Sequence, residues 1–153
     1  MQKIRIAHLG KWLSTASLLL ICAFASAENA SQTVTESIED WLKVTHPVEL
    51  TPGVPFDVEI EVLKLDAPTK LGVDLNYMKQ DGKFGGMLKW GGTPRDIAAP
   101  GKMVWSLKFT AKPGMSDALI SVCLSPDGEW NNRTKNASSG RIKVKLDSGA
   151  ASK

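Results

Sequence analysis

The chain has 153 residues, of which 42% are hydrophobic and 23% are charged, with a formal net charge of +3 at pH 7. No cluster of Lys and Arg concentrates that charge, which excludes nucleic acid and anionic membrane as expected partners, since both are bound through dense positive charge. The length suits one domain with its own core.

Residues 1–27 have the pattern of a cleaved export signal. Basic residues precede an apolar stretch from Trp12 to Phe24, which ends at Ala25-Ser26-Ala27, a small-x-small cleavage pattern. A transmembrane helix needs about 20 apolar residues, so we expect no stable membrane insertion. Lipidation at Cys22 is disfavoured because Ile21 precedes it, where Gly, Ala or Ser is normal. We therefore expect a periplasmic or secreted protein that begins near Glu28.

Removal of residues 1–27 changes the charge and the available chemistry. All sixteen acids remain, and the nineteen basic residues fall to sixteen because the signal carries three. His46 and Cys123 then stand alone, which excludes an internal disulfide and leaves too few ligands for a copper or zinc site. A His-based catalytic triad has no recognisable nucleophile motif. We expect no cofactor, a buried Cys123 and a solvent-facing His46 at a strand end.

The first part of the processed chain gives weak structural signals. Residues 28–40 are small and polar and predict a flexible N-terminal segment. Two interpretations remain open for the next residues. One is an opening strand interrupted near Pro47, and the other is a short helix from Ile38 to Val44 with Ser37 as its N-cap.

Alternation of apolar and polar residues dominates the rest of the chain. Residues 56–62 place the apolar side chains on one face and three acids on the other, as in a half-buried strand. Asp81-Gly82 predicts a tight hairpin turn, and residues 148–153 predict a disordered tail. Further strands are predicted over 71–78, 103–109, 118–124 and 141–147.

This pattern predicts an all-β fold, an antiparallel two-sheet immunoglobulin-like sandwich of seven or eight strands over residues 41–147. The segment from Val48 to Ile60 has a strand that ends in Pro-Gly before a Phe-x-Val-x-Ile strand. In this the chain resembles bacterial immunoglobulin-like or fibronectin type III-like domains. It lacks the cysteine pair of antibody domains, and Leu75 or Tyr77 stands where their core tryptophan would be.

Two aromatic segments rich in glycine or turn residues stand outside the clean alternation, at 84–92 and 125–132. Their aromatic side chains either form an exposed platform or cap the ends of the core, whereas Trp41 and Trp105 are expected in the core. With the platform interpretation, the candidate ligand-binding residues are Phe84, Trp90, Asp127, Trp130, Asn131 and Asn132.

These features favour an exported, non-catalytic binding or interaction domain with a protein or glycan partner in the envelope or exterior. One alternative is a carbohydrate-binding module that stacks sugars on exposed tryptophan. A more distant alternative is a carboxylate-based hydrolase, which requires two acids to converge in a cleft. A calcium site would require the acids Asp74, Asp81, Asp127 and Glu129 to converge at one end of the sandwich, and none of them forms a dense Asp-x-Asp-x-Asp-Gly loop.

Overall fold

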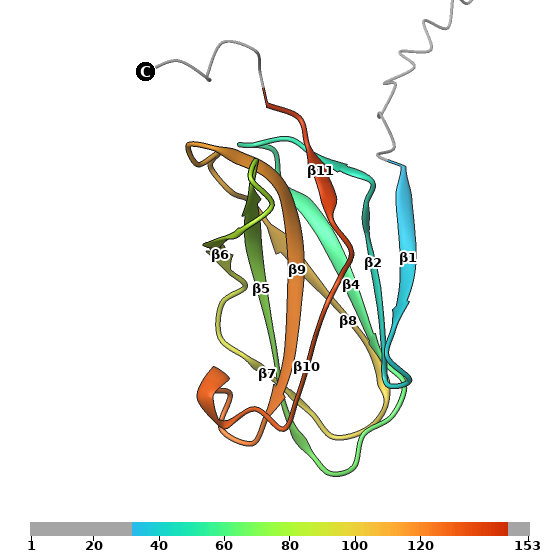
Figure 1. The fold of residues 1–153 in the computed structure, drawn as a ribbon. Coiled ribbons are helices and arrows are strands. Elements are labelled where there is room, and N and C mark those ends of the chain that lie inside the picture. Colours follow the sequence, from blue (N-terminus) through green and yellow to red (C-terminus); the bar gives the residue numbers. More distant parts are fainter. Residues whose placement is uncertain (1–31, 147–153) are drawn as a thin grey trace, which may run out of the picture.

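A computed structural model describes residues 32–146 of the chain, so the expected signal and the tail at 148–153 lie outside the described residues. Within that range the chain forms β-strands and one short 3₁₀ turn, and no helix there is long and apolar enough to cross a membrane (Figure 1). The elements are β1 (Thr33–Ile38), β2 (Leu42–Pro47), β3 (Glu49–Leu50), β4 (Phe56–Val62), β5 (Thr69–Lys79), β6 (Phe84–Trp90), β7 (Arg95–Ile97), β8 (Gly101–Leu107), β9 (Met115–Ser125), η1 (Trp130–Asn132), β10 (Lys135–Ser138) and β11 (Ile142–Val144).

The strands form two sheets that enclose one hydrophobic core (Figure 1). A four-stranded sheet has the order β1-β2-β4-β8, and a seven-stranded sheet has the order β3-β11-β9-β5-β6, with β10 paired to β9 and β7 paired to β5. Within the described range, β3 and β11 pair in parallel and the other pairs are antiparallel. Ile60 and Trp105 of one sheet and Leu75 and Ile120 of the other belong to the same buried cluster.

The alternation in the sequence explains how each strand is oriented. In β4, the side chains of Val58, Ile60 and Val62 are buried while Glu59 and Glu61 point away from the core. The structure confirms this strand and the strands predicted around residues 71–78, 103–109 and 118–124. It also confirms that Trp41, Trp105 and Cys123 are buried. The all-β prediction is therefore correct.

Two contacts join the margins of the two sheets. Arg95 of β7 lies over the ring of Trp105 in β8, with its guanidinium carbon 4.4 Å from the ring centroid, and it donates a 2.7 Å hydrogen bond to the carbonyl of Val104. At another margin, Glu36 of β1 accepts a 2.7 Å hydrogen bond from the amide of Gly140 in the connection between β10 and β11. Side-chain contacts thus connect the two sheets at both margins.

The beginning of the domain differs from the expectation. Residues 33–38 form β1, which pairs along its whole length with β2, so the prediction of a flexible segment over 28–40 was wrong for these residues. The alternative of a helix from Ile38 to Val44 is also wrong, because β2 is a strand that pairs with β4 on its other side. A polar segment can form a strand when a buried neighbour supplies the hydrogen-bonding edge.

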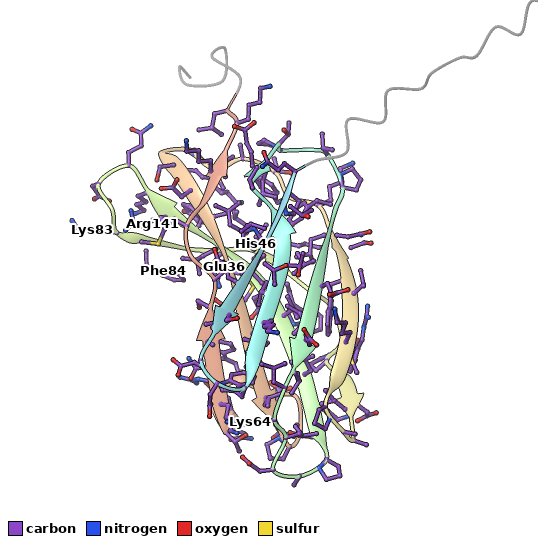
Figure 2. The ribbon with its side chains drawn as sticks, turned by 90° about the vertical axis from the view of Figure 1, so that its right-hand side faces the viewer. Glu36, His46, Lys64, Lys83, Phe84 and Arg141 are labelled. Atoms are coloured by element: carbon purple, nitrogen blue, oxygen red, sulfur yellow. The ribbon has the colours of Figure 1, made fainter. Side chains whose placement is uncertain are left out.

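His46 is buried, with 3% of its surface exposed, so the prediction of a solvent-facing histidine was wrong. Its Nδ1 lies 2.8 Å from the carbonyl oxygen of Pro47, and its Nε2 lies 3.4 Å from a carboxylate oxygen of Glu36 (Figure 2). The alternation of Leu42, Val44 and His46 places the imidazole on the buried face of β2, and Glu36 of β1 lies beside it.

We expect Trp105→Ala to lower the free energy of unfolding by about 3–5 kcal/mol, because it removes a fully buried ring from the core and leaves a cavity. Urea denaturation followed by circular dichroism measures this change. The neighbouring exposed Val104 supplies the control, since Val104→Ala should change stability by less than about 0.5 kcal/mol. Equal effects of the two substitutions would contradict the placement of Trp105.

Candidate functional site

The two sheets present different outer faces. On the four-stranded sheet, the outward side chains are mainly charged or hydroxylated, including Lys43, Glu59, Glu61 and Lys102. The ammonium of Lys102 lies 2.8 Å from a carboxylate oxygen of Glu59 and 3.9 Å from one of Glu61. This is the composition of a solvated face.

The outer face of the seven-stranded sheet is apolar and aromatic along β6. Phe84, Met87 and Trp90 are 62%, 52% and 52% exposed. Cross-strand partners share a face of a sheet, so these three side chains lie beside their partners on the outward side of β5. We call the following set the aromatic face: Phe84, Met87 and Trp90 of β6, Asp74, Asn76 and Met78 of β5, and Leu119 and Ser121 of β9.

Two register shifts between β5 and β6 create this arrangement. They leave Gly85 and Leu88 without a partner in β5, and such bulges change which side chains share a face. Residues three apart, rather than two apart, therefore point outward together. Gly85 is required at one bulge because a Cβ there would lie 2.1 Å from Cε2 of Tyr77.

The polar groups in the middle of the aromatic face bond to one another. Asn76 is buried and donates a 2.8 Å hydrogen bond from its amide nitrogen to the hydroxyl of Ser121. That hydroxyl lies 3.0 Å from the hydroxyl of Ser138 in β10. These contacts leave Asn76 and Ser121 little capacity for an external ligand.

Asp74 is the exception on this face. Its Oδ1 is buried and has no hydrogen-bond partner, and none of its oxygens forms an ion pair among the described residues. Burial raises the pKa of this carboxyl group, while the nearby amide of Gly91 opposes the shift. Burial raises the pKa of the Cys123 thiol as well, with a further contribution from the negative charge of Asp74.

The segment 125–132 lies at the Trp90 end of the aromatic face. A Cβ built on Gly128 would lie 3.0 Å from Cγ of Pro94, which follows β6, and 3.2 Å from Cδ of Lys70 in β5. A Cβ on Gly72 of β5 would lie 3.8 Å from the same Pro94 atom. The two predicted segments are thus brought together through Pro94 and Gly128.

Asp127 organises this second segment rather than facing outward as a free acceptor. Its carboxylate accepts hydrogen bonds from the hydroxyl of Ser125 at 2.7 Å, from the amide of Glu129 at 2.8 Å and from the side-chain amide of Asn132. The bonds from Ser125, Asn132 and Glu129 lower the pKa of Asp127 to about 2. The side chains of Asp127 and Asn132 therefore stabilise the turn through these hydrogen bonds.

Trp130 is 37% exposed, but its ring carries an internal partner. The guanidinium carbon of Arg133 lies 4.7 Å from the ring centroid, and Arg133 also donates a 2.8 Å hydrogen bond to the carbonyl of Trp130. Asn131 beside it is exposed. Of the two candidate tryptophans, Trp90 is therefore the one with the more exposed ring, because Arg133 stacks on the ring of Trp130.

Phe84 lies at the other end of β6 from Trp90, beside the β5–β6 turn, where Figure 2 shows it near Lys83 and Arg141. Asp81 belongs to the same turn, so it does not converge with Asp127 as a calcium site would require. No group of three or more His, Cys, Asp or Glu in the described range is placed to hold a metal ion. Sequence reasoning missed Met87, although the three-residue spacing of Phe84, Met87 and Trp90 was visible.

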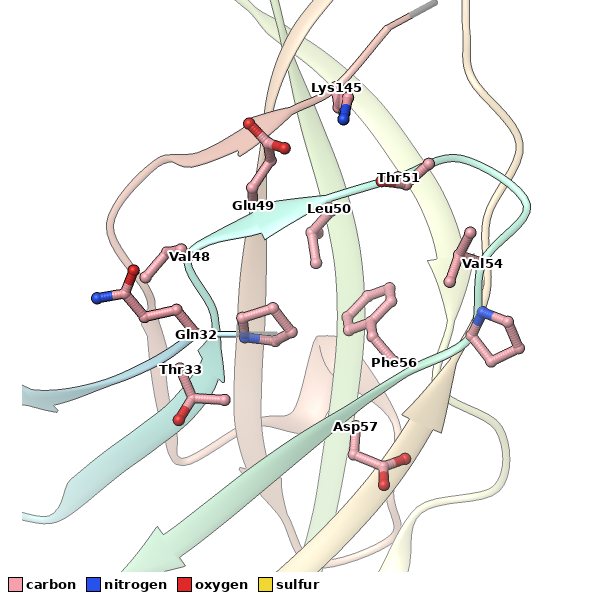
Figure 3. A pocket seen from close by; sticks show the side chains of 12 residues that line it. Gln32, Thr33, Val48, Glu49, Leu50, Thr51, Val54, Phe56, Asp57 and Lys145 are labelled. Atoms are coloured by element: carbon pink, nitrogen blue, oxygen red, sulfur yellow. The ribbon is translucent and has the colours of Figure 1, made fainter. Parts of the chain in front are cut away.

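A separate cavity of about 620 Å³ lies beside β3 and the start of β4 (Figure 3). Val54 and Phe56 line it together with Val48 and Leu50, and Lys145 stands at its rim. None of the six residues expected from the sequence to bind a ligand contributes to this cavity.

No family model matches this chain, and no curated protein does. Among solved structures, a superoxide reductase (neelaredoxin) from Ignicoccus hospitalis is 19% identical, with 79% of this chain and 89% of that chain covered at a TM-score of 0.36. The alkylpurine DNA glycosylase AlkC of Pseudomonas fluorescens, bound to DNA containing an abasic site analog, is 17% identical at a TM-score of 0.35. That match covers 76% of this chain and 31% of the glycosylase chain. Both TM-scores are low, so neither likeness bears on the function.

We expect the loop around Asp127 to keep its structure down to strongly acidic pH. A carboxylate whose pKa is lower in the folded state than in the unfolded state stabilises the fold above the unfolded value of 3.8, and loses this effect as the pH falls toward about 2. Amide chemical shifts of Gly128 and Glu129, followed by NMR between pH 5 and 1.5, should titrate with a midpoint near 2. A midpoint near 4 would contradict the three hydrogen bonds to Asp127.

Proposed function

We propose that the chain is an exported, non-catalytic interaction domain that binds a protein partner through its aromatic face. The contrast between the two outer faces carries the proposal. A soluble domain has no structural need to expose Phe84, Met87 and Trp90 together on one strand, whereas the outward side chains of its other sheet are mainly charged or hydroxylated.

The composition of the aromatic face favours a protein over a glycan. Aromatic residues and Met are enriched in protein interfaces, and tryptophan is prominent among the residues that dominate binding energy. A sugar needs free hydrogen-bonding groups beside the ring on which it stacks. Here, among the described residues, Asp74 is the one free polar side chain opposite Trp90, because Asn76 and Ser121 bond to each other, and Asp127 and Asn132 are engaged within their own loop.

The bulges in β6 favour binding by the face of the sheet rather than by strand addition at its edge. β6 is the last strand of the seven-stranded order. Bulges twist an edge strand and interrupt the regular row of backbone groups that an added strand would need. We therefore expect the partner to contact side chains of β6 more than its backbone.

The strand order supports the immunoglobulin-like assignment as part of the same proposal. The order β11-β9-β5-β6 is compatible with the G-F-C-C′ sheet of such domains, and β2-β4-β8 with their A-B-E strands. The short parallel pairing of β3 with β11 fits a first strand that crosses from one sheet to the other. Domains of this class commonly serve as binding modules, and this analogy agrees with a non-catalytic role.

We expect Trp90→Ala to abolish capture of a defined protein partner by the immobilised domain, because it removes the largest exposed side chain of the face. Crosslinking in envelope extract, followed by binding measurements with the purified partner, tests this. Val104→Ala is the matched control, since Val104 is 48% exposed on the other sheet. Unchanged binding by a folded Trp90→Ala variant would refute the proposal. Fluorescence changes of Trp90 with a polysaccharide, without protein capture, would favour the carbohydrate-binding module instead.

The export part of the proposal has its own test. We expect N-terminal sequencing of the protein from the exporting host to begin at Glu28, because Ala25 and Ala27 supply the small residues that signal peptidase requires. Ala27→Tyr should leave the precursor uncleaved. Recovery of an intact N-terminus from the unchanged chain would contradict cleavage.

A further inference from the structure

One acid on the aromatic face lacks the partners that the other polar groups have. Asp74 is directly opposite Trp90 in the β5–β6 register, and side chains in such positions have Cβ atoms about 4.5–5.5 Å apart. An exposed indole and a partly buried carboxylate therefore adjoin each other on the outer face of the β5–β6 pair. Asp74 is the single acid in the set of residues that defines the aromatic face.

The charge of Asp74 is uncompensated within the described chain. No Lys, Arg or His nitrogen lies within 4.0 Å of its oxygens, and its Oδ1 is buried without a hydrogen bond. Arg133 is committed elsewhere, since it stacks on Trp130 and donates a 3.2 Å hydrogen bond to Asn136. An ionised carboxylate removed from water without a partner is unfavourable, and a cation that reached it would relieve this cost.

We propose that Asp74 and Trp90 together recognise a basic side chain, Arg or Lys, of the protein partner. The inference rests on the proposed protein-binding function and names the chemistry of the partner at the Trp90 end of the aromatic face. The aliphatic stem and cationic head of such a side chain would lie over the exposed indole, and its N–H groups would donate to the carboxylate of Asp74.

Other ligands of a carboxylate fit this place less well. A metal ion needs several oxygen, nitrogen or sulfur ligands, and among the described residues no group of three or more acids, His or Cys is placed to supply them. A sugar needs several hydrogen-bonding groups and would find Asp74 alone free on this face of the described chain, because Asn76 and Ser121 are already bonded. A basic side chain needs only one carboxylate and one aromatic face.

Short peptides provide a direct test of the charge requirement. We expect acetyl-Gly-Arg-Gly-amide to shift the NMR signals of the Trp90 indole and of the Gly91 amide, and the neutral isostere with citrulline in place of Arg to shift them far less. Asp74→Asn should remove the response to the Arg peptide. Asp117→Asn is the matched control, because Asp117 lies on the same outward side of β9 but opposite Met78 and Lys143. Equal shifts by both peptides, no shift by either, or an unchanged Asp74→Asn response would overturn the proposal.

Binding measurements on the two variants distinguish a failure of this inference from a failure of the proposed function. With the purified partner, we expect Asp74→Asn to weaken binding roughly tenfold to a hundredfold, the range for loss of a charge-assisted hydrogen bond, and Asp117→Asn to leave it unchanged. If Trp90→Ala abolishes binding while Asp74→Asn does not, the basic-side-chain inference fails and the binding face stands. If the folded Trp90→Ala variant binds normally, the proposed function itself fails.

Discussion

The long antiparallel pairing of β5 with β9 is the constraint on which the rest of the structure depends. It runs from Lys70 opposite Ser125 to Lys79 opposite Met115, and it fixes which side chains of both strands face the core. Leu71, Val73 and Leu75 turn inward. Because the side-chain period of a strand is two, the same register sends Asp74 outward. A shift of one residue would bury Asp74 and expose the leucines.

The bulges of β6 change which of its side chains lie on the outward face that the β5–β9 register defines. With regular pairing, residues 84, 86, 88 and 90 would share the outward face, and two of them would be Gly86 and Leu88. The two shifts instead place Met87 between Phe84 and Trp90 on that face and turn Leu88 partly toward the core. Gly85 permits one of these shifts because the ring of Tyr77 occupies the space of a side chain. The aromatic face is thus a consequence of backbone irregularity as well as composition.

The core strands were predictable because their information is local. Residues 56–62 and 103–107 alternate cleanly, and the structure has strands at both places. β1 and β10 were not predicted, since their side chains are mostly polar and each depends on a neighbouring strand for its hydrogen bonds. The burial of His46 was missed although its alternation with Leu42 and Val44 places it on the buried face of β2.

The sequence by itself determined the all-β class, the burial of Trp41, Trp105 and Cys123, and the turn at Asp81-Gly82, because periodicity and turn chemistry act over a few residues. Only the tertiary structure decided how the candidate residues are grouped. It separates Phe84 from Trp130, joins the two aromatic segments through Pro94 and Gly128, and leaves Asp74 unpaired beside Trp90. These relations depend on strand register and bulges, which arise from contacts between segments distant in the chain.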